Sequence, residues 1–205
     1  MNFFSKDFVM GYFSRNKKYF IISLAIFGAG FLLGAFVNFL IVGTGYGEIS
    51  TLFRASDNVT LNDLLIDSGE LFFNNLRVDL LTILSGFLFS VFSVLIFFFN
   101  AILIALPFGE DFTFAFMGII PHGIFEYAAS VVSLVAAFLI TRIELDVIGA
   151  FKDNAKSVRG VISESKMKIY DIVFSIILDV ALLAVAALIE GNITPRILLL
   201  AFGHG

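Results

Sequence analysis

One short segment of the chain combines residue types that are rare inside apolar sequence. Residues 121–126 read Pro-His-Gly-Ile-Phe-Glu and interrupt an apolar stretch over residues 112–140. His122 and Glu126 lie four residues apart, so on a helix they would share one face. Such a pair can bind a metal or exchange protons, bind or pass a solute, or hydrogen-bond to backbone groups at a break. These interpretations remain open at the level of sequence.

The same segment predicts an interruption of the helix that enters it. Pro121 has no backbone N–H and Gly123 frees the chain to turn, so we expect the helix to stop there. At membrane depth, broken backbone and ionisable side chains are tolerated only where protein or water covers them. The segment therefore marks a site sheltered from lipid.

The motifs of common catalytic and metal sites are missing around this pair. A zinc protease helix would carry His-Glu-x-x-His, and the second histidine of this chain is His204, far along the sequence. The chain has no Gly-x-Ser-x-Gly or paired-aspartate motif and no cysteine. We expect no catalytic residues, no bound metal and no cofactor.

A second ionisable group lies in the last apolar run, where Asp179 falls near the middle. An ionised carboxylate at the centre of a bilayer costs about 2.5–3.5 kcal/mol on insertion scales, so Asp179 should be protonated, paired or hydrated. The predicted spans contain no lysine or arginine to pair with it, which leaves His122, Asn38 and Asn100 as candidate partners. Asp179 either binds a proton or another ion, or is a neutral acid that fixes the register of two helices.

The composition requires lipid as the solvent for much of the chain. Of 205 residues, 59% are hydrophobic, 27 are phenylalanine and only 15% are charged, and the mean hydropathy is +0.99. A soluble domain of this size cannot bury that much apolar surface. The net charge of −4 is sorted along the chain, and there is no basic patch with interleaved aromatics, so we expect no nucleic-acid binding.

The apolar runs predict an all-α, polytopic membrane bundle of about five crossings. Basic residues at 1–18, and six basic against four acidic residues at 142–168, favour a cytoplasmic N-terminus and an external C-terminus. The third crossing should be broken or re-entrant at residues 107–111. We expect one transmembrane domain over residues 1–205, with crossings at residues 19–42, 80–98, 100–120, 124–141 and 170–189.

Two stretches between the crossings read as interfacial amphipathic helices. Residues 61–77 and 147–162 carry apolar side chains at helical spacing opposite charged ones. In the first crossing, Gly30 and Gly34 form a small-xxx-small pair. The pair either packs against another helix of the same chain or makes a face for a homo-oligomer.

Several of these motifs together resemble the stage II sporulation protein M family. The matching strings are Phe-Asn-Asn-Leu-Arg-Val at 73–78, Phe-Asn at 99–100, Pro-His-Gly-Ile-Phe-Glu at 121–126, Ile-Glu at 189–190 and Thr-Pro at 194–195, together with Gly86. The resemblance covers most of residues 70–196. One departure is that Ala101 and Ala105 stand where glycines are expected after Asn100.

The resemblance implies a five-span, non-enzymatic membrane protein. The family's namesake resembles the membrane anchor of a complex with stage II sporulation proteins D and P, which remodel septal peptidoglycan, and many relatives occur in organisms that do not sporulate. We therefore expect a cell-membrane scaffold that contacts lipids and recruits other envelope or membrane proteins. The alternative is a small transporter, channel or lipid-moving protein that uses the segment at Pro121–Glu126, with Asn100 and Asp179, as a polar site.

Overall fold

The computed structural model describes residues 3–42, 67–110, 112–153 and 157–202, and these residues form helices without a strand. The predicted all-α membrane bundle is confirmed. The elements in chain order are α1 (Lys6–Val42), α4 (Ser68–Leu84), the 3-10 helix η1 (Ser85–Leu88), α5 (Val91–Ala105), α6 (Pro107–Glu110), α7 (Phe112–Asp153), α8 (Val158–Glu164), α9 (Lys166–Asn192) and α10 (Thr194–Phe202).

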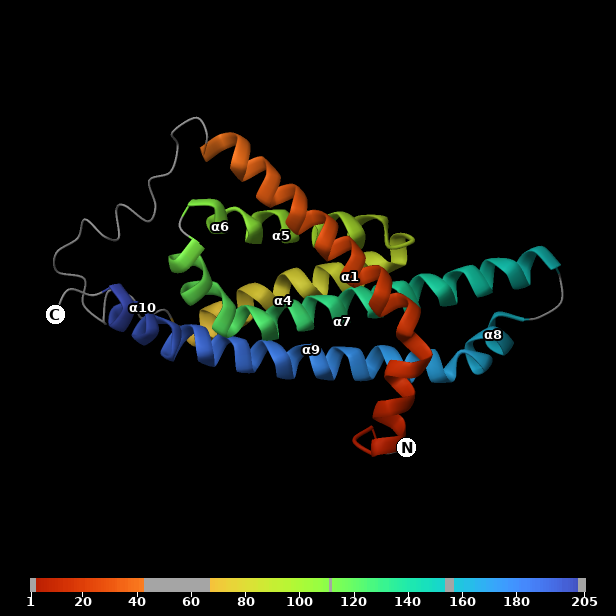
Figure 1. Ribbon diagram of the computed structural model, residues 1–205. Helices are drawn as coiled ribbons and strands as arrows, with labels where there is room; N and C mark the ends of the chain where they lie inside the picture. The colour runs from red at the N-terminus through yellow and green to blue at the C-terminus, as the bar shows by residue number, and fades with distance from the viewer. Residues whose placement is uncertain (1–2, 43–66, 111, 154–156, 203–205) are drawn as a thin grey trace.

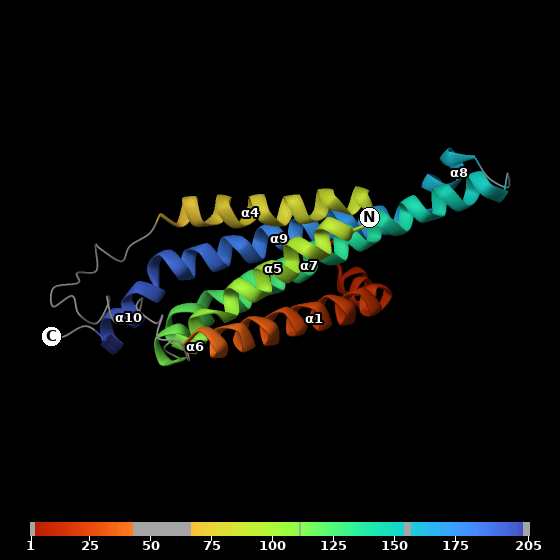
Figure 2. The same ribbon diagram turned by 90° about the horizontal axis from the view of Figure 1, so that it is seen from above.

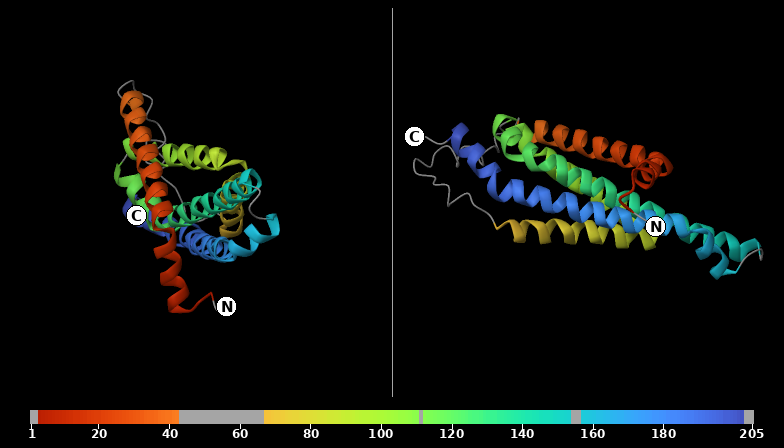
Figure 3. Two further views of the ribbon diagram at one scale, coloured as in Figure 1. Left: turned by 90° about the vertical axis from the view of Figure 1, so that its right-hand side faces the viewer. Right: turned by 90° about the horizontal axis from the view of Figure 1, so that it is seen from below.

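α4, α5, α7 and α9 lie roughly along one axis, with α7 and α9 packed against each other at the centre, and α1 crosses them obliquely (Figure 1). α1 and α4 lie on opposite sides of this pair, and α5 runs beside α1 (Figure 2; Figure 3, right). We call the two ends of the bundle the α8 end and the α10 end. The chain starts toward the α8 end and finishes at the α10 end (Figure 2).

Four helical segments are long and apolar enough to cross a membrane: residues 6–40, 68–88, 112–152 and 166–202. α5 is a shorter apolar helix of 15 residues, about 22 Å long at 1.5 Å per residue, against a hydrocarbon core of about 30 Å. Large apolar side chains cover the outer surface; Leu32 on α1, for example, is 71% exposed. Lipid is the natural partner for such a surface.

The predicted crossing at 80–98 is wrong. Its residues belong to two antiparallel elements, because Phe89 and Ser90 adopt left-handed backbone conformations (φ 54° and 55°) and turn the chain between η1 and α5. Ser90 Oγ lies 2.6 Å from Thr141 Oγ1 on α7, which holds the turn in place. The span before the turn covers residues 68–88 and so starts earlier than the predicted residue 80. Polar residues such as Asp79 can lie within this span because they are buried inside the bundle.

The predicted helix stop at Pro121 is also wrong. α7 runs through Pro121 as one helix of 42 residues, so residues 112–120 begin this long helix instead of completing a separate third crossing. The break predicted at 107–111 falls where α6 joins α5 to α7; a re-entrant path there stays a prediction. Proline is tolerated inside membrane helices where neighbouring elements cover the freed backbone group, and α10 packs against α7.

The two predicted amphipathic helices are not separate surface elements. Residues 68–77 form the first half of α4, which packs on α7 and α9, while 43–66 lie outside the described residues. Residues 147–162 are not one helix, since α7 ends at Asp153 and α8 begins at Val158. Charge and apolar spacing at the surface therefore did not reveal where these helices begin and end.

The small residues of the first crossing face α5 of the same chain. A Cβ on Gly30 would lie 2.9 Å from Ala101 Cβ, and one on Gly34 would lie 2.8 Å from Ala105 Cβ and closer still to the Ile102 carbonyl oxygen. Ala101 and Ala105 are almost fully buried. The family resemblance leads us to expect glycines at 101 and 105, which would let α5 pack closely against a neighbouring helix. Here the glycines are on α1 instead, and they allow α1 and α5 to pack closely.

Gly34→Ala should push α1 away from α5, because the added methyl group meets backbone as well as side chain. We expect the free energy of unfolding in detergent micelles to fall by about 1–3 kcal/mol, the usual cost of overpacking. Gly28→Ala is the matched control, because its Cβ would meet nothing within 4 Å. Equal effects of the two substitutions would contradict this packing.

Candidate functional site

The inward face of α9 carries three acidic residues at different depths in the bundle. Asp171 and Asp179 are 2% and 0% exposed, and the side chain of Glu190 is 22% exposed. Each meets a side chain from a different helix: Arg15 on α1, Asp79 on α4 and His122 on α7. Polar side chains on α9 therefore contact three other helices of the bundle.

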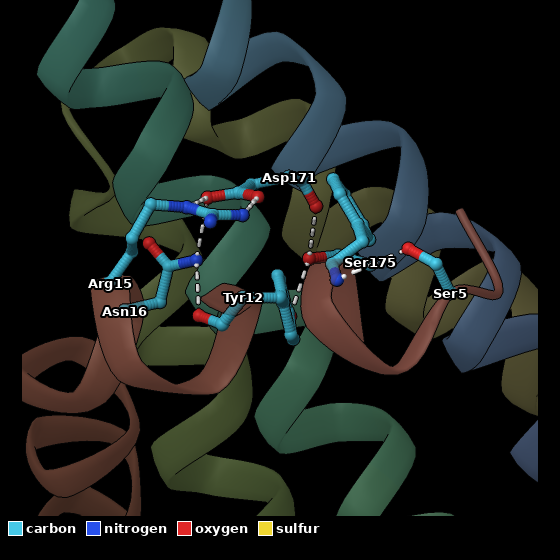
Figure 4. Close-up of polar contacts among 7 residues, drawn as sticks. Ser5, Tyr12, Arg15, Asn16, Asp171 and Ser175 are labelled. Atoms are coloured by element: carbon cyan, nitrogen blue, oxygen red, sulfur yellow. Dashed lines mark hydrogen bonds and ion pairs between the residues drawn. The ribbon is translucent and has the colours of Figure 1, made fainter. Parts of the chain in front are cut away.

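Toward the α8 end, Asp171 is held by charged and neutral donors from α1 (Figure 4). Arg15 binds both of its carboxylate oxygens, with Nη2–Oδ1 and Nε–Oδ2 distances of 2.6 and 3.1 Å. Asn16 Nδ2 donates to Oδ2 at 2.9 Å. One turn further along α9, Ser175 Oγ lies 2.7 Å from the Tyr12 hydroxyl. This fully paired carboxylate fixes α1 against α9.

In the middle of the bundle two carboxyl groups face each other. Asp79 on α4 and Asp179 on α9 lie close enough to interact, and α7 donates to each: Ser130 Oγ to Asp79 Oδ1 and Ser133 Oγ to Asp179 Oδ1, both at 2.9 Å. The two Oδ2 atoms are buried and have no donor among the described side chains. A proton shared between them would satisfy both, since two facing carboxylates without a cation repel each other.

Toward the α10 end, His122 faces two glutamates. Its Nε2 lies 3.9 Å from Glu126 Oε2 and 3.9 Å from Glu190 Oε1, and its Nδ1 lies 3.4 Å from the Thr194 hydroxyl on α10. Asn75 on α4 donates to the other oxygen of Glu126. Within the described residues, His122, Glu126 and Glu190 form the one group of histidine and carboxylates close enough to share a cation.

A polar pocket of about 200 Å³ lies between the middle and α10-end groups. Asn75, Asp79, Glu126 and Ser130 line it, together with Asn100 from α5. It therefore adjoins both the aspartate pair and the His122 group. Carboxyl, imidazole and amide groups in this arrangement can bind protons or cations.

The structure brings together only some of the residues singled out from sequence. His122 and Glu126 share one face of α7 and meet at the same site. Asp179 meets Asp79 instead of His122 or Asn38; Asn38 donates to the Leu106 carbonyl oxygen near the turn after α5. Pro121 lies inside α7, and Gly123 packs under Tyr127, where a Cβ would lie 2.9 Å from the ring.

Sequence reasoning did not assign a role to Asp79 or to the pair of Arg15 with Asp171, and it placed Glu190 only within a family string. The available signal was spacing. Asp171, Ser175, Asp179 and Leu183 recur every four residues along α9 and all are buried, as expected of one helix face. Their partners come from other helices, which no local pattern reveals.

Fold and site together define a polytopic helical membrane protein whose interior is linked by buried carboxyl groups. A family model described as Stage II sporulation protein M matches residues 23–195. The chain therefore belongs to this family, and the match includes His122, Glu126, Asp179 and Glu190. No curated protein and no solved structure matches the chain.

A proton shared between Asp79 and Asp179 would be visible by infrared spectroscopy. Asp179→Asn keeps the shape and lets the amide donate to Asp79, so the chain should fold while the infrared carbonyl band of a protonated carboxyl group disappears. Asp146→Asn is the control, because Asp146 is paired with Arg142 and Lys168. An unchanged band in Asp179→Asn would show that the pair holds no proton.

Proposed function

We propose that the protein is a membrane scaffold that recruits partner proteins through the segment where α7 leaves the bundle. We call this segment the arm and define it as residues 142–153 of α7, α8 and residues 166–170 of α9. Its basic residues favour a cytoplasmic location for the α8 end, with the α10 end outside. An anchoring role agrees with what the family resemblance implies for the namesake protein.

The length of α7 is the observation that carries this proposal. A helix of 42 residues is about 63 Å long, twice the hydrocarbon thickness of about 30 Å. Gly86 packs on Ala137 and Ser90 on Thr141, so the turn between α4 and α5 meets α7 at this level. Beyond it α7 continues for a further 12 residues, and α8 folds back beside it (Figures 1 and 2).

The arm is stiffened by its own contacts and still exposes apolar side chains. Asp146 pairs with Arg142 on α7 at 3.3 Å and with Lys168 on α9 at 2.7 Å. Leu145 and Phe151 are 46% and 65% exposed in a stretch that also carries charged residues. Outside the hydrocarbon such side chains favour contact with another protein.

An apolar groove of about 670 Å³ lies at the base of the arm, between η1, α7, α8 and α9. Glu144 lies in its wall, and Glu144 Oε2 is buried without a hydrogen-bond partner among the described residues. An apolar helix of a partner protein that brings one hydrogen-bond donor would fill the groove and satisfy this oxygen. This is the occupant that we assign to the groove.

A photo-crosslinking amino acid at Ile148, in the groove wall, should capture one defined membrane protein in native cells. The same probe at Phe36, which is exposed on α1 far from the arm, should capture only lipid. Glu144→Ala should reduce the Ile148 product several-fold, because the partner's donor loses its acceptor.

In the same cells, Ser157→Cys should react with an impermeant thiol reagent only when the cytoplasmic face is opened.

The scaffold proposal would fail if Ile148 and Phe36 gave the same products, or if Glu144→Ala left the Ile148 product unchanged. The first result would mean that the groove faces lipid as α1 does. The second would mean that the partner does not insert beside Glu144.

The polar pocket favours a second candidate, proton or cation movement through the bundle. Asp79 and Glu126 both line it, and ionisable groups around a polar cavity inside a helical bundle are typical of transporter sites. In that case, vesicles that contain the protein should dissipate a pH gradient faster than empty vesicles, and Asp179→Asn should abolish the difference. A wild-type rate equal to that of empty vesicles would exclude this candidate.

A further inference from the structure

His122 and the two glutamates converge without being hydrogen-bonded to one another. Nε2 lies 3.9 Å from one oxygen of each glutamate, well beyond the roughly 2.7–3.2 Å of a hydrogen bond. All three atoms lie within 4.8 Å of one another. Ligand atoms bound at about 2.0–2.2 Å to one tetrahedral cation stand about 3.3–3.6 Å apart, so the three side chains must close by roughly 0.5–1 Å to reach that geometry.

The imidazole ring is buried and already oriented for this role. The His122 side chain is 9% exposed, and among the described residues its Nε2 receives no hydrogen bond. With Thr194 beside Nδ1, the tautomer that donates from Nδ1 leaves the Nε2 lone pair directed between the two carboxylates. The second nitrogen of a ligating histidine usually meets a carboxylate, a backbone carbonyl or water, and the Thr194 hydroxyl, 3.4 Å away, occupies that position here.

The net charge of His122, Glu126 and Glu190 also favours the binding of a cation. Glu126 and Glu190 are 17% and 22% exposed in their side chains, and within the described part of the chain neither forms an ion pair with a lysine or arginine. Asn75 donates to Glu126 Oε1 and so turns Oε2 toward His122. Two carboxylates and one neutral imidazole balance the charge of a divalent cation.

We propose that His122, Glu126 and Glu190 bind one divalent cation of the class that accepts mixed nitrogen and oxygen ligands, for which Zn²⁺ is the probe. The cation joins α7 to α9 near the start of α10, with Thr194 and Asn75 as positioning residues. This site is independent of the arm, and it reverses our expectation from sequence that no metal is bound. The missing third ligand in the sequence motif is Glu190, 64 residues after Glu126.

The test uses the full chain in lipid nanodiscs, purified without a polyhistidine tag and stripped with a chelator. Zn²⁺ titrated by calorimetry should bind at about one ion per chain and raise the thermal unfolding midpoint. Glu190→Gln keeps the size of the side chain and should weaken binding at least tenfold. Thr194→Val should weaken it about 10–100-fold, the usual effect of losing a residue that orients a ligand.

Glu144→Gln is the matched control, since Glu144 is also a half-buried glutamate but lies in the groove at the arm. It should leave Zn²⁺ affinity unchanged. Should Glu190→Gln unfold in the absence of metal, the visible spectrum of the Co²⁺-loaded wild type decides instead, because a bound imidazole and two carboxylates give it a low-symmetry signature that aqueous Co²⁺ lacks.

Three results would overturn the proposal: no binding of Zn²⁺ above that of empty nanodiscs, equal losses in Glu190→Gln and Glu144→Gln, or a Co²⁺ spectrum identical to that of the aqueous ion. Full displacement of Zn²⁺ by equimolar Mg²⁺ would likewise overturn it, because a site with an imidazole ligand prefers Zn²⁺.

Discussion

The cost of placing carboxyl groups in an apolar interior is the constraint on which the rest of the bundle depends. α9 carries three such groups, and each meets a different partner: Asp171 a guanidinium, Asp179 a second carboxyl group and a serine hydroxyl, and Glu190 the imidazole of His122. Because removal of one partner leaves a buried group unsatisfied, these contacts determine which helices may neighbour α9 and in what register. Apolar side chains fill the space between them without selecting one arrangement.

Local features of the sequence were enough to predict the protein class and part of the site. Hydropathy indicated a helical membrane bundle, and the four-residue spacing correctly put His122 and Glu126 on one helix face. The boundaries of the second and third spans were wrong because Asp79 was treated as a residue that belongs in water. The continuous path of α7 was missed because covering by α10, which offsets the effect of Pro121, is a tertiary contact.

The partners of the buried acids could not be predicted for the same reason. Arg15 counted as one of several basic residues flanking the first span, and nothing within its own segment indicates that it binds a carboxylate 156 residues later. Asp79 and Asp179 are separated by a hundred residues, and their contact requires α4 and α9 to be neighbours. Sequence patterns report the face on which a residue lies, while tertiary packing decides what that face meets.

The unbroken course of α7 has a mechanical consequence. A hydrogen-bonded helix resists bending far more than a loop does, so the part inside the bilayer and the part beyond it move as a single lever. The pivot lies where Gly86 meets the backbone of Ala137, since a Cβ there would lie 2.8 Å from the Ala137 Cα and leaves no room for sliding. A partner that tilts the arm at Phe151 would therefore displace His122 in the opposite direction, so that the two ends of α7 change position together.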